Sequence, residues 1–330
     1  MVSSSKMSVA VRLLEPEGYI VHAPPTQTIT IYSTDSPGAI PRAKAYVQAR
    51  LNAIVQANPW LTGRVVTDFI GTNLSLQYDP TANTLPLEES SMPKLSTAMD
   101  YQELTNLFKP LEVRQGTDLI NKDEPPFRVH WITITPTRCA LFMTISHGIS
   151  DGYTYYRYRL YGMLSATTPI QTLDPNRFYD FEQVSNVNSA WGNDSAALMS
   201  RFPLICNILG TLLFSPKPNY ALRTISKDWI AREKAKAVAH LPHVAFVSTN
   251  DVLTSWFFRE CNSVVGFMTI NYRGRMKGLA SHLAGNYTSW LGYQPEDYAS
   301  PALMRESLTS NVLRRVALAT FRGCSRALHQ

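Results

Sequence analysis

The stretch Ser146-His147-Gly148-Ile149-Ser150-Asp151-Gly152 directly follows Cys139–Ser146, a run that is almost entirely apolar or β-branched. A continuous apolar run bounded by turn residues predicts a central strand that is buried on both faces. A second predicted strand, Phe127–Thr135, precedes it, and Pro136-Thr137-Arg138 predicts a turn that joins the two as a hairpin. His147 is therefore expected at the end of a buried strand, where a rigid support can present it to a cleft.

The residue types in this stretch suit acid–base chemistry. Imidazole titrates near neutral pH, so His147 can take a proton from a hydroxyl or amine and return it later. Asp151 lies four residues on, across a turn that Gly148 and Gly152 would allow. It could orient the imidazole directly, or hold the loop through an arginine. The alternative interpretation is a surface or core histidine beside an aspartate that caps a helix.

Strands and helices alternate irregularly along the rest of the chain. Apolar periodicity predicts further strands and helices, and 103–114 is a weaker, partly helical segment. The predicted strands are 27–32, 74–78, 221–225 and 264–270, with another near 60–66, and the predicted helices are 43–58, 152–164, 227–240, 248–259 and 301–318. No glycine-rich phosphate loop is present. The pattern predicts an α+β protein with an N-terminal half (1–169), a crossover linker (170–219) and a C-terminal half (220–330).

Composition limits the possible functions. The chain has 330 residues, a net charge of +6 and 17% charged residues, which is the composition of a folded protein. The basic residues are scattered and no nucleic-acid-binding motif occurs, so no nucleic-acid partner is expected. The excess positive charge fits either an ordinary solvated surface or a basic entrance to a binding site for an anionic cosubstrate.

Targeting and metal signals are also absent. The cysteines, at 139, 206, 261 and 324, lack metal-ligand spacing, so no metal is expected and reduced thiols fit a cytoplasmic protein. The N-terminus has no apolar signal core, and the apolar run 204–214 is too short to span a bilayer. We therefore expect a monomeric protein without an integral membrane segment.

The 146–152 stretch resembles the HxxxD signature of the CoA-dependent acyltransferase superfamily. This group includes the plant and fungal BAHD acyltransferases, chloramphenicol acetyltransferase and the condensation domains of peptide synthetases. Further blocks resemble segments of the family, in the family's order over about residues 15 to 310. These blocks are Pro59–Arg64, Pro126–Val129, Ser248–Trp256, Asn271–Met276 and Gly285-Asn286.

The resemblance implies a chloramphenicol acetyltransferase-like fold, in which two mixed sheet and helix halves enclose a central tunnel. It implies that His147 is the general base for transfer of an acyl group from acyl-CoA to a small alcohol or amine, in secondary metabolism. Acyl-CoA would be a cosubstrate, and no permanently bound cofactor is expected.

The resemblance also implies supporting roles. Asp151 would be mainly structural and would pair with Arg273 or Arg275, between which the sequence does not decide, and Gly152 would serve the turn. Ser248 and Thr249 are candidates to lie near the pantetheine arm of CoA, although helix capping is an equal alternative. Lys277, with the two arginines, is a candidate for CoA phosphates, and ion pairs that hold the fold are the alternative.

Two departures from the family pattern matter. Ser146 stands where condensation domains have the first histidine of HHxxxDG, which favours CoA over a carrier protein as the donor. No Asp-Phe-Gly-Trp-Gly block occurs, so we expect the second half to be incomplete and to lack the C-terminal part. The alternatives are a catalytically impaired homologue that binds a ligand or partner, and a condensation-domain-like acyltransferase.

Overall fold

The computed structural model of the chain describes residues 8–156, 160–165, 167–181, 209–210, 213–214, 223–241 and 243–309. Contacts within the chain divide it into two units. The first comprises Met1–Tyr179 and Lys277–Tyr287, and the second comprises Asp180–Met276 and Thr288–Gln330. The first unit therefore includes a short segment, 277–287, that comes late in the chain, which the sequence patterns did not indicate. The division at 1–169, 170–219 and 220–330 stays a prediction.

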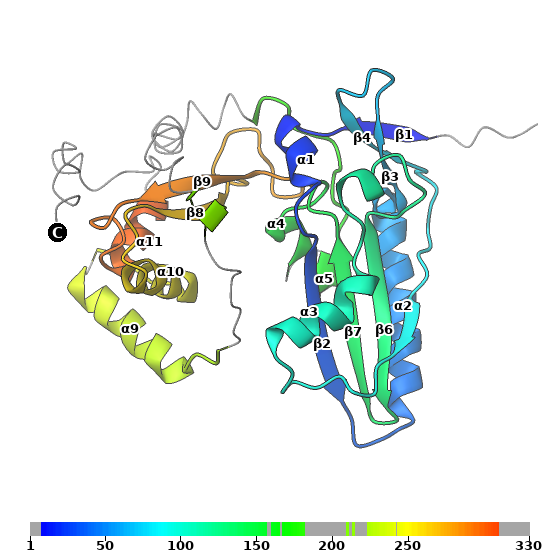
Figure 1. Cartoon of the computed structure of the whole chain (residues 1–330), viewed down its shortest axis with the longest axis horizontal. Helices are drawn as coiled ribbons and strands as arrows, with labels where there is room; N and C mark the ends of the chain where they lie inside the picture. Colours follow the sequence, from blue (N-terminus) through cyan, green and yellow to red (C-terminus); the bar gives the residue numbers. More distant parts are fainter. Residues whose placement is uncertain are drawn as a thin grey trace, which may run out of the picture. The chain divides into compact units, whose positions relative to one another are not determined.

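A four-stranded sheet with mixed strand directions lies in the first unit (Figure 1). The strands are β2 (Thr26–Ser33), β5 (Glu88–Ser91), β6 (Phe127–Thr135) and β7 (Arg138–Ile145). Their order is β2-β7-β6-β5; β5 runs parallel to β6, and the other pairs are antiparallel. The structure confirms the predicted hairpin of 127–135 with 139–146 and the predicted strand 27–32.

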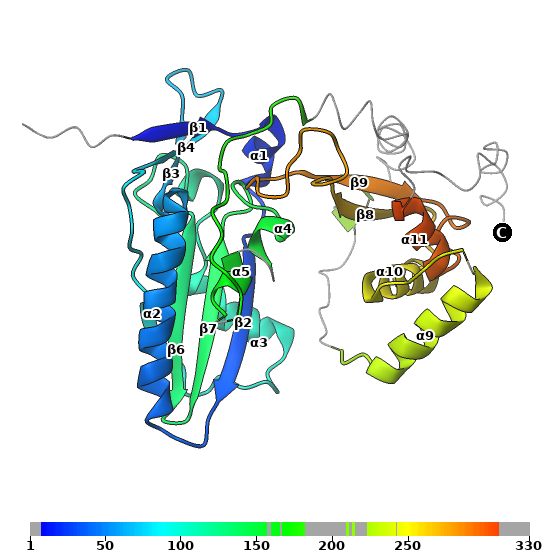
Figure 2. The same ribbon diagram turned by 180° about the vertical axis from the view of Figure 1, so that it is seen from behind.

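Helices cover both faces of this sheet. Figure 1 shows α3 (Tyr101–Phe108) in front of it, and Figure 2, from behind, shows α2 (Ala39–Ala57) in front of it. The odd-numbered residues 139–145 of β7 belong to the apolar core that includes α2, whereas residues 140 and 142 belong to the core that includes α3. Successive side chains of a strand point to opposite faces, so a strand covered on both sides must be apolar along its length. This explains the apolar run of β7.

The predicted helix 43–58 is confirmed, but its predicted start was wrong. The helix α2 begins at Ala39 and includes Pro41 in its first turn. Proline fits there because the first backbone N–H groups of a helix have no partner within the helix.

A smaller sheet has the order β1-β4-β3, with β1 (Val9–Arg12), β3 (Arg64–Thr67) and β4 (Leu74–Tyr78) all antiparallel. The helix α1 (Glu15–Ile20) follows β1. The short 3-10 helices are η1 (Pro59–Thr62), η2 (Lys109–Leu111) and η3 (Gly116–Asp118). Strand β4 was predicted, whereas β1, β5 and α1 were not.

The chain after β7 is less regular than predicted. Instead of one helix over 152–164, the structure has α4 (Gly152–Tyr155) and α5 (Leu160–Met163), and residues 157–159 lie outside the described part. The Tyr155 hydroxyl donates to the Met143 carbonyl of β7 at 2.6 Å, and this bond ties α4 to the sheet.

In its described residues, the second unit contains an antiparallel pair of strands and the helices α9, α10 and α11. The strands are β8 (Gly266–Asn271) and β9 (Thr288–Tyr293), and the helices are α9 (Lys227–His240), α10 (Thr249–Glu260) and α11 (Pro301–Thr309). The helices share an apolar core that includes Ala237, Val252 and Ala302. Strand β9 was not predicted. Predicted helices 227–240 and 248–259 are confirmed, as is 301–318 as far as residue 309.

Some predictions fall outside the described residues. Only parts of the apolar run 204–214 and of the predicted strand 221–225 are described, and residues 223–225 form no strand. Within the described residues, no helix combines the length and the apolar character needed to cross a bilayer.

Candidate active site

His147 lies in the turn that immediately follows β7. The backbone N–H of Ser146 donates to the Pro126 carbonyl at 2.7 Å, which extends the pairing of β6 and β7 by one residue. The N–H of Ile149 then donates back to the Ser146 carbonyl at 3.2 Å. His147 therefore projects from a hydrogen-bonded turn at the end of a buried hairpin, where the sequence placed it.

The two glycines of the motif have different roles. A Cβ atom at Gly148 would lie 2.7 Å from Cβ of Val21, the residue that ends α1, so only glycine fits there without a shift. At Gly152 the nearest atom to such a Cβ is in the ring of Tyr156, at an ordinary 3.5 Å. Neither glycine has a positive φ. The close approach of α1, rather than an unusual backbone angle, requires glycine at 148, and no such requirement exists at 152.

The imidazole of His147 makes no side-chain hydrogen bond to the described residues. The residue is half-buried, and its Nδ1 atom is completely buried without a partner among them. Of the two ring nitrogens, only Nδ1 is a buried atom without a partner in the described part of the chain. No hydrogen bond from a described side chain fixes the ring, whereas the backbone at residue 147 is held by the hydrogen bonds of the turn.

Asp151 holds the turn and does not bond the imidazole. Its Oδ1 accepts from the N–H and the hydroxyl of Thr154, both at 2.9 Å, so it caps α4. Its Oδ2 accepts from the N–H of Tyr287 at 3.1 Å, and its own N–H donates to the Gly285 carbonyl at 3.3 Å. Asp151 therefore joins the turn to the late segment 277–287.

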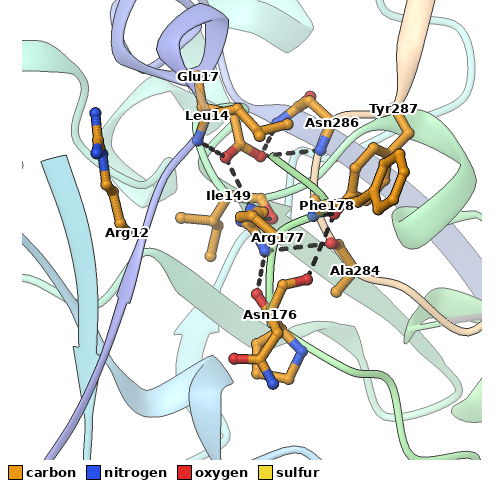
Figure 3. Close-up of polar contacts among 12 residues, drawn as sticks. Arg12, Leu14, Glu17, Ile149, Asn176, Arg177, Phe178, Ala284, Asn286 and Tyr287 are labelled. Atoms are coloured by element: carbon orange, nitrogen blue, oxygen red, sulfur yellow. Dashed lines mark hydrogen bonds and ion pairs between the residues drawn. The ribbon is translucent and has the colours of Figure 1, made fainter. Parts of the chain in front are cut away.

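A buried ion pair that sequence reasoning missed lies next to this turn (Figure 3). Arg177 donates from Nε to Oε2 of Glu17 at 2.8 Å, and both side chains are fully excluded from solvent. Breaking such a pair typically costs about 3–5 kcal/mol because a buried charge is left alone. Arg177 also donates to the carbonyls of Pro175 at 2.6 Å, Ala284 at 3.2 Å and Ile149 at 3.4 Å.

Asn286 hydrogen-bonds the same carboxylate (Figure 3) and also the backbone of the histidine. Its backbone N–H and its Nδ2 donate to Oε1 of Glu17, at 2.9 and 3.0 Å. The same Nδ2 donates to the backbone carbonyl of His147 at 2.9 Å. The "Gly-Asn" pair was noticed in the sequence, but the contact with the histidine backbone was not foreseen.

The candidates of the second unit already have structural partners. Ser248 caps α10: its hydroxyl accepts from the N–H of Asp251 at 3.2 Å, and its own N–H donates to Asp251 Oδ2 at 2.7 Å. Thr249 is the exposed first residue of that helix. Asp251 also accepts from Nε of Arg305 at 2.8 Å.

The two predicted arginines differ in exposure. Arg273 is buried, and its guanidinium donates to Oδ1 of Asn271 at 3.0 Å. Arg275 is exposed and donates to the Leu308 carbonyl at 2.6 Å. Lys277 is exposed and belongs to the first unit. The pairing of Asp151 with one of the arginines stays a prediction.

Two cavities of about 810 Å³ each lie in the first unit, and His147 lines neither of them. One lies against the first half of α2 and the opposite end of β7, where it is lined by Cys139 and Leu141. The other is polar and lies beside α1, with Arg12, His22 and Lys122 in its lining. The described residues contain no group of three His, Cys, Asp or Glu side chains that could hold a metal ion.

Comparison with solved structures gives the fold. F. graminearum TRI101, solved in complex with coenzyme A and T-2 mycotoxin, is 14% identical and has a TM-score of 0.54, over 92% of this chain and 75% of that one. F. sporotrichioides TRI101, also with coenzyme A and T-2, is 17% identical with a TM-score of 0.52, over 93% and 74%. The first condensation domain of the calcium-dependent antibiotic synthetase, solved with a substrate analogue, is 13% identical with a TM-score of 0.53, over 94% and 80%.

No protein-family model matches the sequence, and no curated protein matches it. At identities of 13–17%, structural similarity shows the fold alone. The chain is an α+β protein whose fold matches, over most of its length, that of TRI101 and of the first condensation domain of the calcium-dependent antibiotic synthetase.

Proposed function

We propose that this protein is an acyltransferase that moves an acyl group from a CoA thioester to a hydroxyl or amine, with His147 as the general base. The observation that carries the proposal is the position of His147. It lies at the end of the buried hairpin, in a turn restrained by hydrogen bonds, in a fold shared with an enzyme solved with coenzyme A.

The chemistry requires one proton acceptor and no covalent enzyme intermediate. Nε2 of His147 takes the proton of the acceptor as its oxygen or nitrogen attacks the thioester carbonyl carbon. The tetrahedral intermediate collapses, the carbon–sulfur bond breaks, and the imidazolium returns the proton to the departing CoA thiolate. The products are the acylated acceptor and free CoA.

The other predicted residues have supporting roles in this proposal. Asp151 keeps the turn in place through Thr154 and Tyr287, and an arginine of the second unit, Arg273 or Arg275, is its proposed ion-pair partner. The exposed Lys277 is available for a CoA phosphate, because phosphates bind most strongly to accessible cations. Ser248 is engaged as a helix cap, so any contact with pantetheine would be an additional role.

Condensation chemistry is the second candidate, because a condensation domain matches this fold as well as TRI101 does. Ser146 favours free CoA as the donor. It replaces the first histidine of HHxxxDG, and it is buried, with its hydroxyl accepting from the N–H of Gly148 at 3.3 Å.

The test is CoA release, followed with a thiol reagent. Acetyl-, malonyl- and aromatic acyl-CoA would each be mixed with a panel of alcohols and amines that includes deoxynivalenol. The proposal predicts acceptor-dependent release of CoA and a matching acylated product by mass spectrometry. Calorimetric binding of acyl-CoA without any release would instead support a ligand-binding homologue, and acylation only from a carrier-bound thioester would support a condensation role.

A further inference from the structure

Glu17, at the start of the chain, is connected to the candidate general base by two short hydrogen-bonded paths. One runs through Asn286 to the carbonyl of His147, and the other runs through Arg177 to the carbonyl of Ile149. The two carbonyls flank Gly148, at the centre of the turn. Figure 3 shows Glu17, Arg177 and Asn286 close to Ile149 of this turn.

The carboxylate of Glu17 is surrounded only by donors. Oε2 accepts from the Leu14 N–H at 2.8 Å and from Arg177 Nε at 2.8 Å, and Oε1 accepts from the two nitrogens of Asn286. A carboxylate satisfies all four because it is an acceptor at both oxygens. An amide of the same shape would turn its NH₂ group toward two donors in either orientation. The site therefore requires a negative charge at this position, not only a side chain of this size.

The backbone of the turn is the part of the motif that this network holds. The imidazole has no side-chain partner among the described residues, and its Nδ1 is buried. Because the ring is attached to this backbone, a shift of the turn at residue 147 displaces the ring. Displacement of a catalytic group by about 1 Å can cost about 100-fold in rate.

We propose that Glu17, Arg177 and Asn286 are positioning residues, which fix the turn so that His147 Nε2 meets the acceptor proton. The inference rests on the proposed role of His147. Its closing experiment therefore includes a measurement on the His147 ring that needs no turnover.

The experiment compares wild type, Glu17→Gln and Asn286→Ala. Ring environment is measured by nuclear magnetic resonance with ¹³C,¹⁵N-labelled histidine, and by the rate at which diethyl pyrocarbonate modifies the His147 peptide. Where CoA release is measurable, kcat and KM for acetyl-CoA are determined. Glu88→Gln is the matched control, because Glu88 also forms a carboxylate–guanidinium pair in the first unit, with Arg128, but at β5 and β6.

We expect Glu17→Gln to change the His147 modification rate at least threefold and to shift its ring signals, with smaller changes of the same kind in Asn286→Ala. We expect kcat to fall at least tenfold with KM changed less than twofold. Glu88→Gln should lower the melting temperature without these effects. If Glu17→Gln does not fold, the Asn286→Ala variant alone tests the proposal. That substitution removes the hydrogen bond to the His147 carbonyl and leaves the ion pair of Glu17 with Arg177.

The inference is overturned if both folded variants lose stability while His147 keeps its wild-type signals and modification rate. If the ring measurements change as expected but no variant or wild type releases CoA, the positioning network stands and the proposed function fails.

Discussion

Replacement of Gly285 by alanine should destabilise the first unit through two separate effects. Gly285 has φ +116°, a backbone angle that residues with a Cβ rarely adopt, and its Cβ would lie 2.8 Å from both Cζ and Nε of Arg177. The backbone strain costs about 1–3 kcal/mol. Displacing a guanidinium that is buried and hydrogen-bonded to Glu17 and three carbonyls adds about 1–3 kcal/mol. The sum is about 2–6 kcal/mol.

Gly71→Ala separates these two effects. Gly71 also has a positive φ, +77°, but nothing lies within 4 Å of its Cβ position, so only the strain applies. Urea unfolding followed by circular dichroism should therefore show Gly285→Ala about 1–3 kcal/mol less stable than Gly71→Ala, or about 0.5–1.5 M lower in midpoint for a slope of about 2 kcal/mol/M. Equal midpoints for the two variants would refute the close packing of Gly285 against Arg177.

Two further predictions concern the large sheet. Tyr155→Phe removes the hydroxyl that donates to the Met143 carbonyl, so it should lower the free energy of unfolding by about 0.5–1.5 kcal/mol. The control is Tyr156→Phe, which should change the free energy of unfolding little because Tyr156 is exposed. Equal effects of the two substitutions in urea unfolding would contradict this prediction. Burial lowers the pKa of His130 below its usual 6.5 despite the nearby carboxylate of Glu88. As the pH falls, His130 is therefore protonated at a higher pH in the unfolded chain than in the folded protein. The free energy of unfolding should then decrease as the pH drops through about 6.5. His130→Gln should reduce that loss between pH 7.5 and 5.5, and an unchanged pH dependence of the urea midpoint would contradict the assignment.

The elements that the sequence predicted best are those whose local pattern matches their surroundings. β7 is apolar along its length because both faces of the sheet are covered, and the hairpin could be located from the turn Pro136-Thr137-Arg138 between its strands. Helices α9 and α10 begin where Ser226 and Ser248 supply caps, and those side chains accept the expected N–H groups. The turn with His147 followed from the end of β7.

The supporting network could not be predicted in the same way. Glu17 and Arg177 are 160 residues apart, and Glu17 and Asn286 are 269 apart. Locally, Glu17 is an acidic residue in the first turn of a short helix, a position typical of exposed glutamates. In the fold its carboxylate is bonded by Arg177 and by Asn286 of segment 277–287, and no periodicity in the sequence encodes the return of that segment to the first unit.

The central claim is that His147 removes the proton from the alcohol or amine that receives the acyl group. The most direct test is CoA release by the His147→Ala variant. His243→Ala is the control, because His243 is exposed in the second unit and its ring hydrogen-bonds Glu306. With acyl-CoA and an acceptor that wild type uses, we expect His147→Ala to lose at least about 100-fold in kcat with its circular dichroism spectrum unchanged, and His243→Ala to match wild type. Turnover by His147→Ala at the wild-type rate would contradict the account.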